Sequence, residues 1–159
     1  MNADTIAKGL SAFRPESVAM DAGRIMLERL HHLTAQRADV AFETTLASRT
    51  FAPWIKSLIA DGYAFRLIFL WLPSADMTVA RVRQRIALGG RQVPEPVIRR
   101  RYEAGLRNFF RLCRPLAEGW RFYDNSVRGR RRLIASGTQG EETVVLNADL
   151  WNNVNKEWR

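Results

Sequence analysis

The sequence predicts an α/β protein with a mostly parallel sheet and flanking helices. Short apolar runs with the composition of buried strands alternate with longer segments whose apolar residues recur at helical spacing. The chain has 159 residues and shows no internal repeat, low-complexity tract or interdomain linker. We therefore expect a single domain over residues 1–159, large enough to enclose a hydrophobic core.

Two helices and a short strand are predicted in the first third of the chain. Residues 16–36 carry an apolar stripe at helical spacing, and residues 51–59 carry a second one that the Asp-Gly pair at 61–62 would end. Between the two helices, residues 40–42 are apolar and predict a short strand that ends at Glu43.

The strongest strand signal is residues 65–72, which are nearly all apolar, as expected of a strand covered on both faces. Ser74 follows this strand and is a suitable N-cap for a helix, which the glycine pair at 89–90 would interrupt. Another helix begins near residue 95 and places Cys113 on its apolar face, which favours a core position for this thiol.

The last third of the chain predicts three further strands and a terminal segment. Residues 120–123 form an apolar strand followed by Asp-Asn-Ser, a typical turn sequence. Two shorter strands follow at 133–135 and 143–146, and the last segment contains Trp151 and Trp158. Packing of that segment is the favoured interpretation, with an interaction surface as the alternative.

The positive charge of the chain is concentrated in one region. The formal net charge is +9, and fifteen arginines but only four acidic residues lie between Arg81 and Arg132. Arginine outnumbers lysine twenty-two to three, and the planar guanidinium suits phosphate oxygens. We expect an anionic partner: nucleotide phosphates, nucleic acid or an acidic protein. A solvated basic surface is the alternative interpretation.

Several classes of protein are disfavoured by the composition. No apolar run approaches the length of a membrane span, and the N-terminus has no secretory signal pattern, so no membrane partner is expected. The single cysteine, Cys113, excludes an internal disulfide and favours the cytoplasm. His31 and His32 have no metal ligands at suitable spacing, so no metal site is expected on protein side chains.

Candidate site residues follow the predicted strands, because ligands bind at the carboxyl ends of the strands in such sheets. Glu43, Thr44 and Thr45 come directly after the predicted strand at 40–42. They predict either a binding site or a cap for the helix that follows. Asp4, near Asn2, would alone be interpreted as a helix-capping aspartate.

The arginine-rich helices predict a lid-like segment at residues 79–113. A Gly-Gly break between two basic helices suits an element that closes over phosphates and excludes water. Arg81 and Arg85 share one helical face at i,i+4 spacing, whereas Arg83 points elsewhere. Arg91 follows the glycine pair.

Short motifs are distributed across nearly the whole chain. They are Asn2-Ala3-Asp4-x-Ile6-Ala7-x-Gly9-Leu10-Ser11, Pro15-Glu16-Ser17, Phe42-Glu43-Thr44-Thr45-Leu46, Phe69-Leu70-Trp71-Leu72-Pro73, Arg81-Val82 with Arg85, Gly89-Gly90 with Val93-Pro94, Ile98-Arg99-Arg100-Arg101-Tyr102 and Tyr123-Asp124-Asn125-Ser126. In their order and spacing, these motifs resemble those of the zeta-toxin family of P-loop kinases. The resemblance implies a P-loop-kinase-like, three-layer parallel sheet with flanking helices.

The resemblance also implies roles for the candidate residues. Asp4 corresponds to the general base that takes a proton from the substrate hydroxyl, and Glu43 to the glutamate that holds the substrate or the metal shell. Thr44 and Thr45 lie beside Glu43 and are expected to bind substrate.

The phosphate side of the reaction is assigned by the same resemblance. Arg85 and Arg91 are the nearest matches to the lid arginines that stabilise the transferring phosphoryl group, with Arg81 as an alternate. The implied reaction moves the γ-phosphoryl group of ATP, with Mg²⁺, to a hydroxyl of a small substrate. A UDP-linked amino sugar is the acceptor of the family's toxins, and an antitoxin protein is the implied partner.

The chain departs from the family at the phosphate-binding loop. Such a loop has the pattern Gly-x-x-x-x-Gly-Lys-Ser/Thr, and none of the three lysines, Lys8, Lys56 and Lys156, lies in it. We expect a form truncated at its N-terminus, lacking the first strand and the P-loop and inactive as written, with Met1 marking a misassigned gene start. The alternatives are a small basic nucleic-acid-binding module and a non-catalytic remnant.

Overall fold

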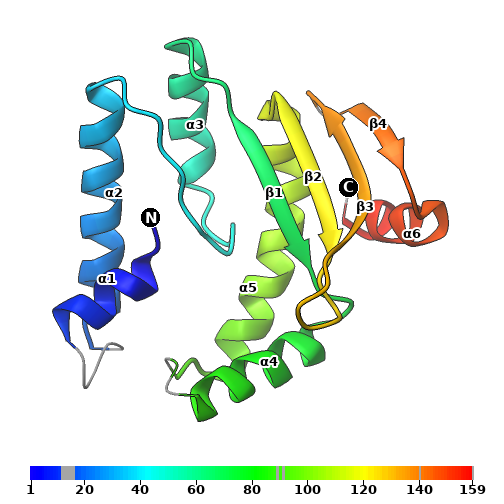
Figure 1. The fold of residues 1–159 in the computed structure, drawn as a ribbon, viewed down its shortest axis with the longest axis horizontal. Helices are drawn as coiled ribbons and strands as arrows, with labels where there is room; N and C mark the ends of the chain where they lie inside the picture. Colours follow the sequence, from blue (N-terminus) through cyan, green and yellow to red (C-terminus); the bar gives the residue numbers. More distant parts are fainter. Residues whose placement is uncertain (12–16, 89, 91, 140, 159) are drawn as a thin grey trace. The chain divides into compact units, whose positions relative to one another are not determined.

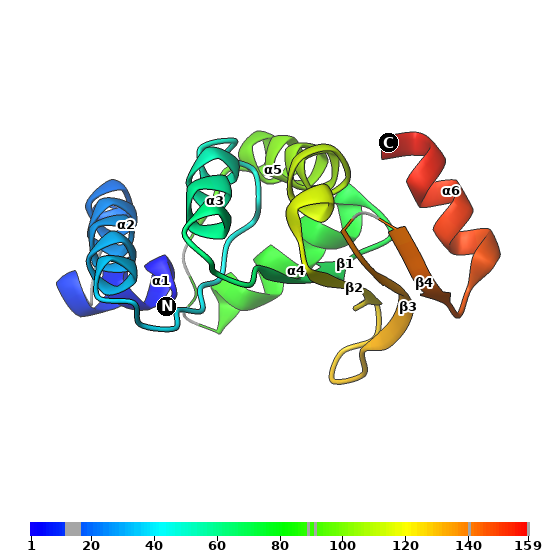
Figure 2. The same ribbon diagram turned by 90° about the horizontal axis from the view of Figure 1, so that it is seen from above.

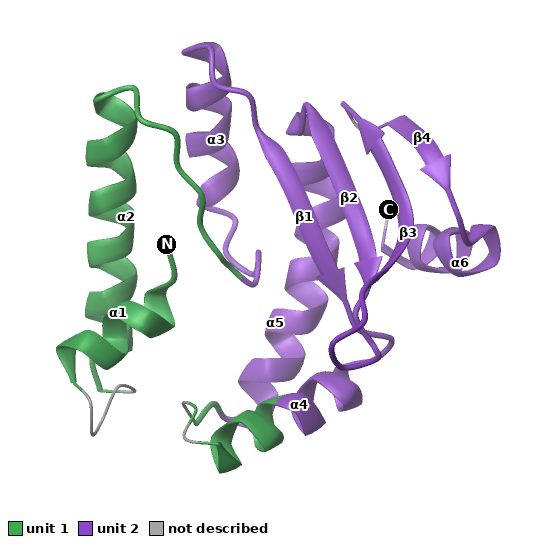
Figure 3. Cartoon of the chain, viewed as in Figure 1, with its two compact units in different colours: residues 1–44, 82–93 green, residues 45–81, 94–159 purple. Residues whose placement is uncertain are grey.

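The computed structural model describes residues 1–11, 17–88, 90, 92–139 and 141–158 (Figure 1). The chain divides into two compact units, coloured separately in Figure 3. Unit 1 comprises Met1–Thr44 and Val82–Val93, and unit 2 comprises Thr45–Arg81 and Pro94–Arg159.

Unit 1 is built on two helices, α1 (Ala3–Leu10) and α2 (Ala19–Ala35), which pack against each other. Small and flexible side chains make this contact: Ala7 is 1% exposed, and Ala22 and Leu30 are fully buried. Alanine allows close approach of the two helix backbones but removes little apolar area from water. Unit 1 therefore has a thin apolar core.

The strand predicted at residues 40–42 is wrong. This segment follows α2 with no regular strand structure, and the backbone on either side of Phe42 bonds to the first residue of the chain: the Met1 ammonium donates to Ala41 O, and Glu43 N donates to Met1 O at 2.9 Å. Two such bonds on either side of Phe42 are what a parallel pair of strands makes. These two bonds do not extend into a regular ladder within the described residues.

Unit 2 contains a four-stranded sheet in the order β1-β2-β3-β4, formed by β1 (Arg66–Trp71), β2 (Gly119–Asp124), β3 (Arg132–Thr138) and β4 (Glu141–Val145). The α/β class is as predicted, and the sheet is partly parallel. Strands β1 and β2 run parallel, whereas β3 pairs antiparallel with both β2 and β4. The connections to β3 and β4 are short, and a short connection can join only antiparallel neighbours.

One face of the sheet in unit 2 is covered and the other is open. Along β1 the side chains alternate: Leu67 and Trp71 are 8% and 6% exposed, whereas Ile68 and Leu70 are 64% and 44% exposed. Helices α5 and α6 lie on the same side of the sheet in Figure 2. The prediction that both faces of this strand are covered is therefore wrong for the described residues.

Unit 2 has helices at the three places where the sequence predicts them, together with two helical turns and a terminal helix that the sequence analysis does not predict. They are α3 (Phe51–Ala60), α4 (Ala75–Ala87), which continues into unit 1, α5 (Glu95–Asn108), a π-helical turn η1 (Phe109–Cys113), a 3₁₀ turn η2 (Arg114–Leu116) and α6 (Ala148–Trp158). Ser74 Oγ accepts from Met77 N at 3.1 Å and caps α4. Gly62 has φ 92° and ends the segment after α3, as a C-terminal glycine does.

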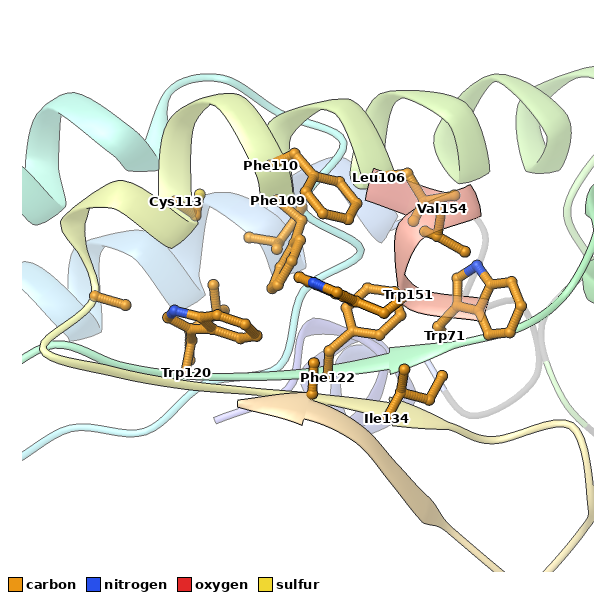
Figure 4. Packing of buried hydrophobic residues seen from close by; sticks show 14 residues of the cluster. Trp71, Leu106, Phe109, Phe110, Cys113, Trp120, Phe122, Ile134, Trp151 and Val154 are labelled. Atoms are coloured by element: carbon orange, nitrogen blue, oxygen red, sulfur yellow. The ribbon is translucent and has the colours of Figure 1, made fainter. Parts of the chain in front are cut away.

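Aromatic rings fill the core of unit 2 (Figure 4). Phe122 on β2 is fully buried and stacks on Phe69 with ring centroids 5.3 Å apart. The indole of Trp151 from α6 stacks on that of Trp120, also at 5.3 Å. Cys113 is 3% exposed, which confirms its predicted core position, and burial raises the pKa of its thiol to about 11.

Candidate functional site

Asn2 connects the start of α1 to Glu43. Its side-chain oxygen accepts from the backbone N–H of Asp4 at 2.8 Å, which makes Asn2 the N-cap of α1. Its amide nitrogen donates to Glu43 Oε2 at 2.6 Å, a short bond because the acceptor is charged. The side-chain amide thus has both ends engaged, and this fixes the Glu43 carboxylate beside the first turn of α1.

A pocket of about 390 Å³ opens at this point of unit 1, lined by Met1, Asn2, Thr5, Ile6 and Glu43. Its walls combine the apolar side chains of Met1 and Ile6 with the hydroxyl of Thr5, the amide of Asn2 and the carboxylate of Glu43. Such a mixture of apolar surface with few polar groups is common in ligand sites. The half-buried Asp4 lies in the same turn of α1 as Thr5, but does not itself line the pocket.

The two threonines after Glu43 fall into different units. Thr44 ends the first segment of unit 1, and Thr45 begins unit 2; both side chains are exposed. The carbonyl oxygen of Thr45 lies so close to Gly105 on α5 that any side chain at position 105 would collide with it. The backbone of Thr45 is therefore fixed by packing within unit 2.

The predicted lid arginines have different surroundings. Arg81 Nη2 donates to the carbonyl oxygens of Asn125 and Ser126, at 2.6 and 2.8 Å. Arg81 thus ties α4 to the loop that follows β2. Arg85 lies one turn further along α4 with an exposed side chain, and Arg91 lies outside the described residues.

The loop after β2 is organised by Asp124, the last residue of that strand. Its carboxylate accepts from Ser126 N and from Arg132 Nη2, each at 2.8 Å, which confirms the turn predicted at this place. Burial opposes ionisation of this carboxyl, but the bonds from Ser126 and the ion pair with Arg132 outweigh it, so its pKa lies below the usual value. The loop is thus held at both Asp124 and Arg81.

The comparisons with known proteins identify the family. A family model described as "Zeta toxin" matches residues 10–126. The chain belongs to the zeta toxin family. An uncharacterised protein of Haemophilus influenzae is 24% identical over 102 residues, which are 64% of this chain and 73% of that protein. No solved structure matches.

Membership places this zeta toxin relative among kinase-like, nucleotide-binding proteins. The matched range includes Glu43, Thr44, Thr45 and the arginines of α4, whereas Asn2 and Asp4 precede it. The assignment of Asp4 consequently depends on the motif around it and on its place beside the Asn2–Glu43 link.

ATP with Mg²⁺ is the usual cofactor of this family, but the 159 residues lack the groups that would hold its phosphates and metal ion. Nowhere does the sequence contain Gly-x-x-x-x-Gly-Lys-Ser/Thr, whose amides and lysine surround the phosphates. Within the described ranges, no three His, Cys, Asp or Glu side chains are grouped to hold a metal ion. We therefore derive no step through ATP or Mg²⁺ from these residues.

None of the helices in the described ranges is long and apolar enough to cross a bilayer.

Sequence reasoning singled out Asp4 and Glu43 but did not find the bond that relates Glu43 to Asn2. The two residues are separated by 41 positions, and no periodic pattern connects them. The anchoring role of Arg81 was also missed, because its partners are backbone carbonyls 44 and 45 positions away, and any residue type supplies a carbonyl.

Proposed function

We propose that this chain carries the acceptor side of a zeta-toxin-type kinase and binds a small hydroxyl-bearing substrate in the pocket of unit 1. The carrying observation is the 2.6 Å bond between Asn2 and Glu43 at the edge of that pocket. It presents an oriented carboxylate and the first turn of a helix to one ligand-sized space. A UDP-linked amino sugar is the substrate class that we propose.

In this proposal the polar residues have separate tasks. Glu43 accepts hydrogen bonds from substrate hydroxyls, and Asn2 holds its carboxylate in place. Asp4 is the general base for the hydroxyl that receives the phosphoryl group, with Thr44 and Thr45 as further contacts to substrate. A base of this kind must reach the hydroxyl directly or through one water, and the first turn of α1 brings Asp4 next to the pocket residue Thr5.

The proposal gives residues 79–113 the role of a lid over the phosphates. Arg85, exposed on α4, is the described arginine best suited to meet a phosphoryl group, with Arg91 as its predicted neighbour. Arg81 would position the loop after β2 instead, since its guanidinium already donates to Asn125 and Ser126. A cytoplasmic location and an antitoxin partner belong to the same proposal.

Lacking a P-loop, the 159 residues alone are proposed to be inactive as a kinase. Phosphoryl transfer depends chiefly on positioning and on charge stabilisation around the phosphates, and here the main contributor is absent from the sequence. The activity would require a phosphate-binding loop, which these residues do not contain.

The test is calorimetric titration with a UDP-linked amino sugar and, separately, with ATP and Mg²⁺. The chain should bind the sugar nucleotide. Glu43→Gln should lower the affinity about tenfold, the usual effect of losing a hydrogen bond to a charged group. Asp39→Asn, an exposed carboxylate of the same unit, is the matched control and should change nothing. Equal affinities for wild type and Glu43→Gln would refute the site.

The ATP titration addresses the missing loop. The 159-residue chain should give no saturable binding of ATP with Mg²⁺, whereas a version extended upstream in frame should bind it. Tight binding by the shorter chain would contradict the proposal, because the arginines would then hold nucleotide without a P-loop.

A nucleic-acid-binding function is the second candidate, supported by the loop between β2 and β3. Arg128, Arg130 and Arg131 are all exposed in it. Contacts of this kind to phosphates release counterions, so affinity would fall steeply with salt. Replacing the three arginines by serine should abolish nucleic-acid binding but leave binding of the sugar nucleotide unchanged, which separates the two functions.

A further inference from the structure

A second pocket, of about 290 Å³, lies entirely within unit 2 at the carboxyl end of β1. Three aromatic side chains line it, Trp71 from β1, Tyr102 from α5 and Trp158 from α6, together with the carboxylates of Glu103 and Glu157. The proposed kinase function uses none of these residues. The volume is at the lower end of the range for ligand pockets, which suits a compact ligand.

The aromatic walls are held in fixed orientations. The rings of Tyr102 and Trp158 meet at 89° with centroids 6.5 Å apart. The Tyr102 hydroxyl donates to Leu72 O at 3.0 Å, which fixes the ring at its far end. Trp71 is 6% exposed and belongs to the aromatic core, where Figure 4 shows it near Val154 of α6. The aromatic rings that face the pocket are therefore already ordered, and a ligand that binds there does not reduce their side-chain entropy further.

The charge of the pocket is opposite to that of the chain. The formal net charge is +9, yet both charged groups that line the pocket are carboxylates, and in the described part of the chain no basic side chain forms an ion pair with Glu103 or Glu157. Arg99, on the same helix, is engaged by Asp76 and Glu95. Burial raises the pKa of the Tyr102 hydroxyl, and the negative charge of Glu157 raises it further, so this carboxylate acts on the pocket.

The chemistry that matches these walls is a cation with an apolar surface. A metal ion would need several oxygen, nitrogen or sulfur ligands, and no group of three His, Cys, Asp or Glu side chains that could hold one occurs in the described ranges. An ammonium ion without alkyl groups keeps a strong hydration shell. An alkylated ammonium loses less hydration, and its methyl groups pack on aromatic faces while the charge is attracted by the rings.

We propose that this pocket binds a small alkylated ammonium ion, with its methyl groups against Trp71, Tyr102 and Trp158 and its charge balanced by Glu103 and Glu157. The site is separate from the acceptor pocket of unit 1 and does not depend on the proposed kinase function. Its failure and the failure of that function can therefore be told apart.

The test is an NMR titration with choline chloride at constant ionic strength, together with 3,3-dimethylbutanol, which has the shape of choline but no charge. Choline should shift the indole N–H signal of Trp158 in a saturable way and leave that of Trp54 on α3 unchanged. The uncharged analogue should bind about tenfold more weakly, the effect expected for loss of a cation–π contact with its counter-charge. Equal binding of the two compounds would overturn the proposal, because the pocket would then recognise shape alone.

Variants distinguish charge from packing. Glu157→Gln and Glu103→Gln should each weaken choline binding about fivefold, while Glu141→Gln on β4, an exposed carboxylate elsewhere in unit 2, should not. Trp158→Phe should keep most of the affinity, and Trp158→Leu should lose about tenfold, with circular dichroism confirming that both are folded. Unchanged affinity in Trp158→Leu, or no shift at Trp158 in the folded wild type at about 50 mM choline, would also overturn it.

Discussion

The two units of this protein bury very different side chains. In unit 2 the fully buried residues include Trp120, Trp151, Phe109 and Phe122, whereas the helix pair of unit 1 buries no aromatic residue in the described ranges, but Ala7, Ala22, Met26, Leu30 and Thr34. Each buried aromatic removes several times the apolar area that an alanine does. The candidate acceptor site lies in the unit with the thinner core. Ligand-binding elements are often among the less stable parts of a protein, because they must adjust to a ligand.

This contrast predicts different consequences for substitutions in the two units. Changes in the aromatic core of unit 2 should lower the free energy of unfolding, whereas changes around Asn2 and Glu43 should alter binding more than stability. The predictions below test this division, beginning with the largest expected effect.

Removing a central ring should have the largest effect on stability. Phe122 is fully buried and contacts the rings of Phe69, Phe109 and Trp151. Phe122→Ala should lower the free energy of unfolding by about 3–5 kcal/mol in a urea titration, since it removes apolar contact and leaves a cavity. Met20→Ala, at a side chain that is 88% exposed, is the control and should change little.

Arg114 should be the most important charged residue for stability. Its side chain is 5% exposed, its guanidinium lies 5.3–5.7 Å from the ring centroids of Phe110, Trp120 and Trp151, and Nη1 contacts Glu142 at 3.3 Å. Arg114→Ala should cost about 2 kcal/mol, because it removes the contacts of a desolvated guanidinium with the aromatic rings. The measurement is a thermal melt of both variants. Arg107→Ala, at an exposed arginine of α5, is the control and should leave the melting temperature unchanged. Equal melting temperatures of the two variants would show that the aromatic setting contributes nothing.

The buried thiol of Cys113 makes stability depend on alkaline pH. Burial raises its pKa from 9.0 to about 11, so between these values the unfolded chain releases the thiol proton and the folded chain keeps it. This contribution to stability is fully present below pH 9 and is lost as the pH rises to 11. In Cys113→Ala, the slope of unfolding free energy against pH in this window should be shallower. An unchanged slope would contradict the assigned cause.

Asn2 should give the smallest effect on stability and separate its two contacts. Asn2→Ala loses the N-cap of α1 and should cost about 1 kcal/mol. Asn2→Asp keeps a capping oxygen but places a negative charge against Glu43. This variant should therefore preserve more of the stability than Asn2→Ala while lowering the affinity for the sugar nucleotide. Unchanged binding of the sugar nucleotide in Asn2→Asp would mean that Asn2 acts only as a cap.

Local patterns predicted much of the fold. The apolar run of β1, the cap at Ser74 and the stop at Gly62 depend on neighbouring residues, and all three occur as expected. Two predictions about strands were wrong, because pairing and burial of a strand depend on residues distant in the sequence. The segment at 40–42 has strand composition but forms no regular strand in the described residues, and the composition of β1 does not reveal that Ile68 and Leu70 remain exposed.

The sites were less predictable than the fold, because they depend on contacts between distant residues. The sequence indicated Asp4 and Glu43 through a resemblance, but not the amide of Asn2 that orients Glu43. It gave no sign that Tyr102 and Trp158, which are 56 positions apart, form one aromatic corner, or that Arg114 is buried while its neighbour in sequence Arg111 is exposed. Pairing of this kind follows from the packing of helices on a sheet and carries no local periodic signal.

Hydrogen exchange measured with and without ligands tests the central claim most directly. A UDP-linked amino sugar should slow exchange at the amides of α1 and of residues 41–44 in unit 1, while ATP with Mg²⁺ should leave exchange unchanged throughout the 159-residue chain. The slowest exchange in the free protein should lie in β1, β2 and α5 of unit 2. Protection by ATP with Mg²⁺, or protection by the sugar nucleotide confined to unit 2, would contradict the assignment of the acceptor site to unit 1.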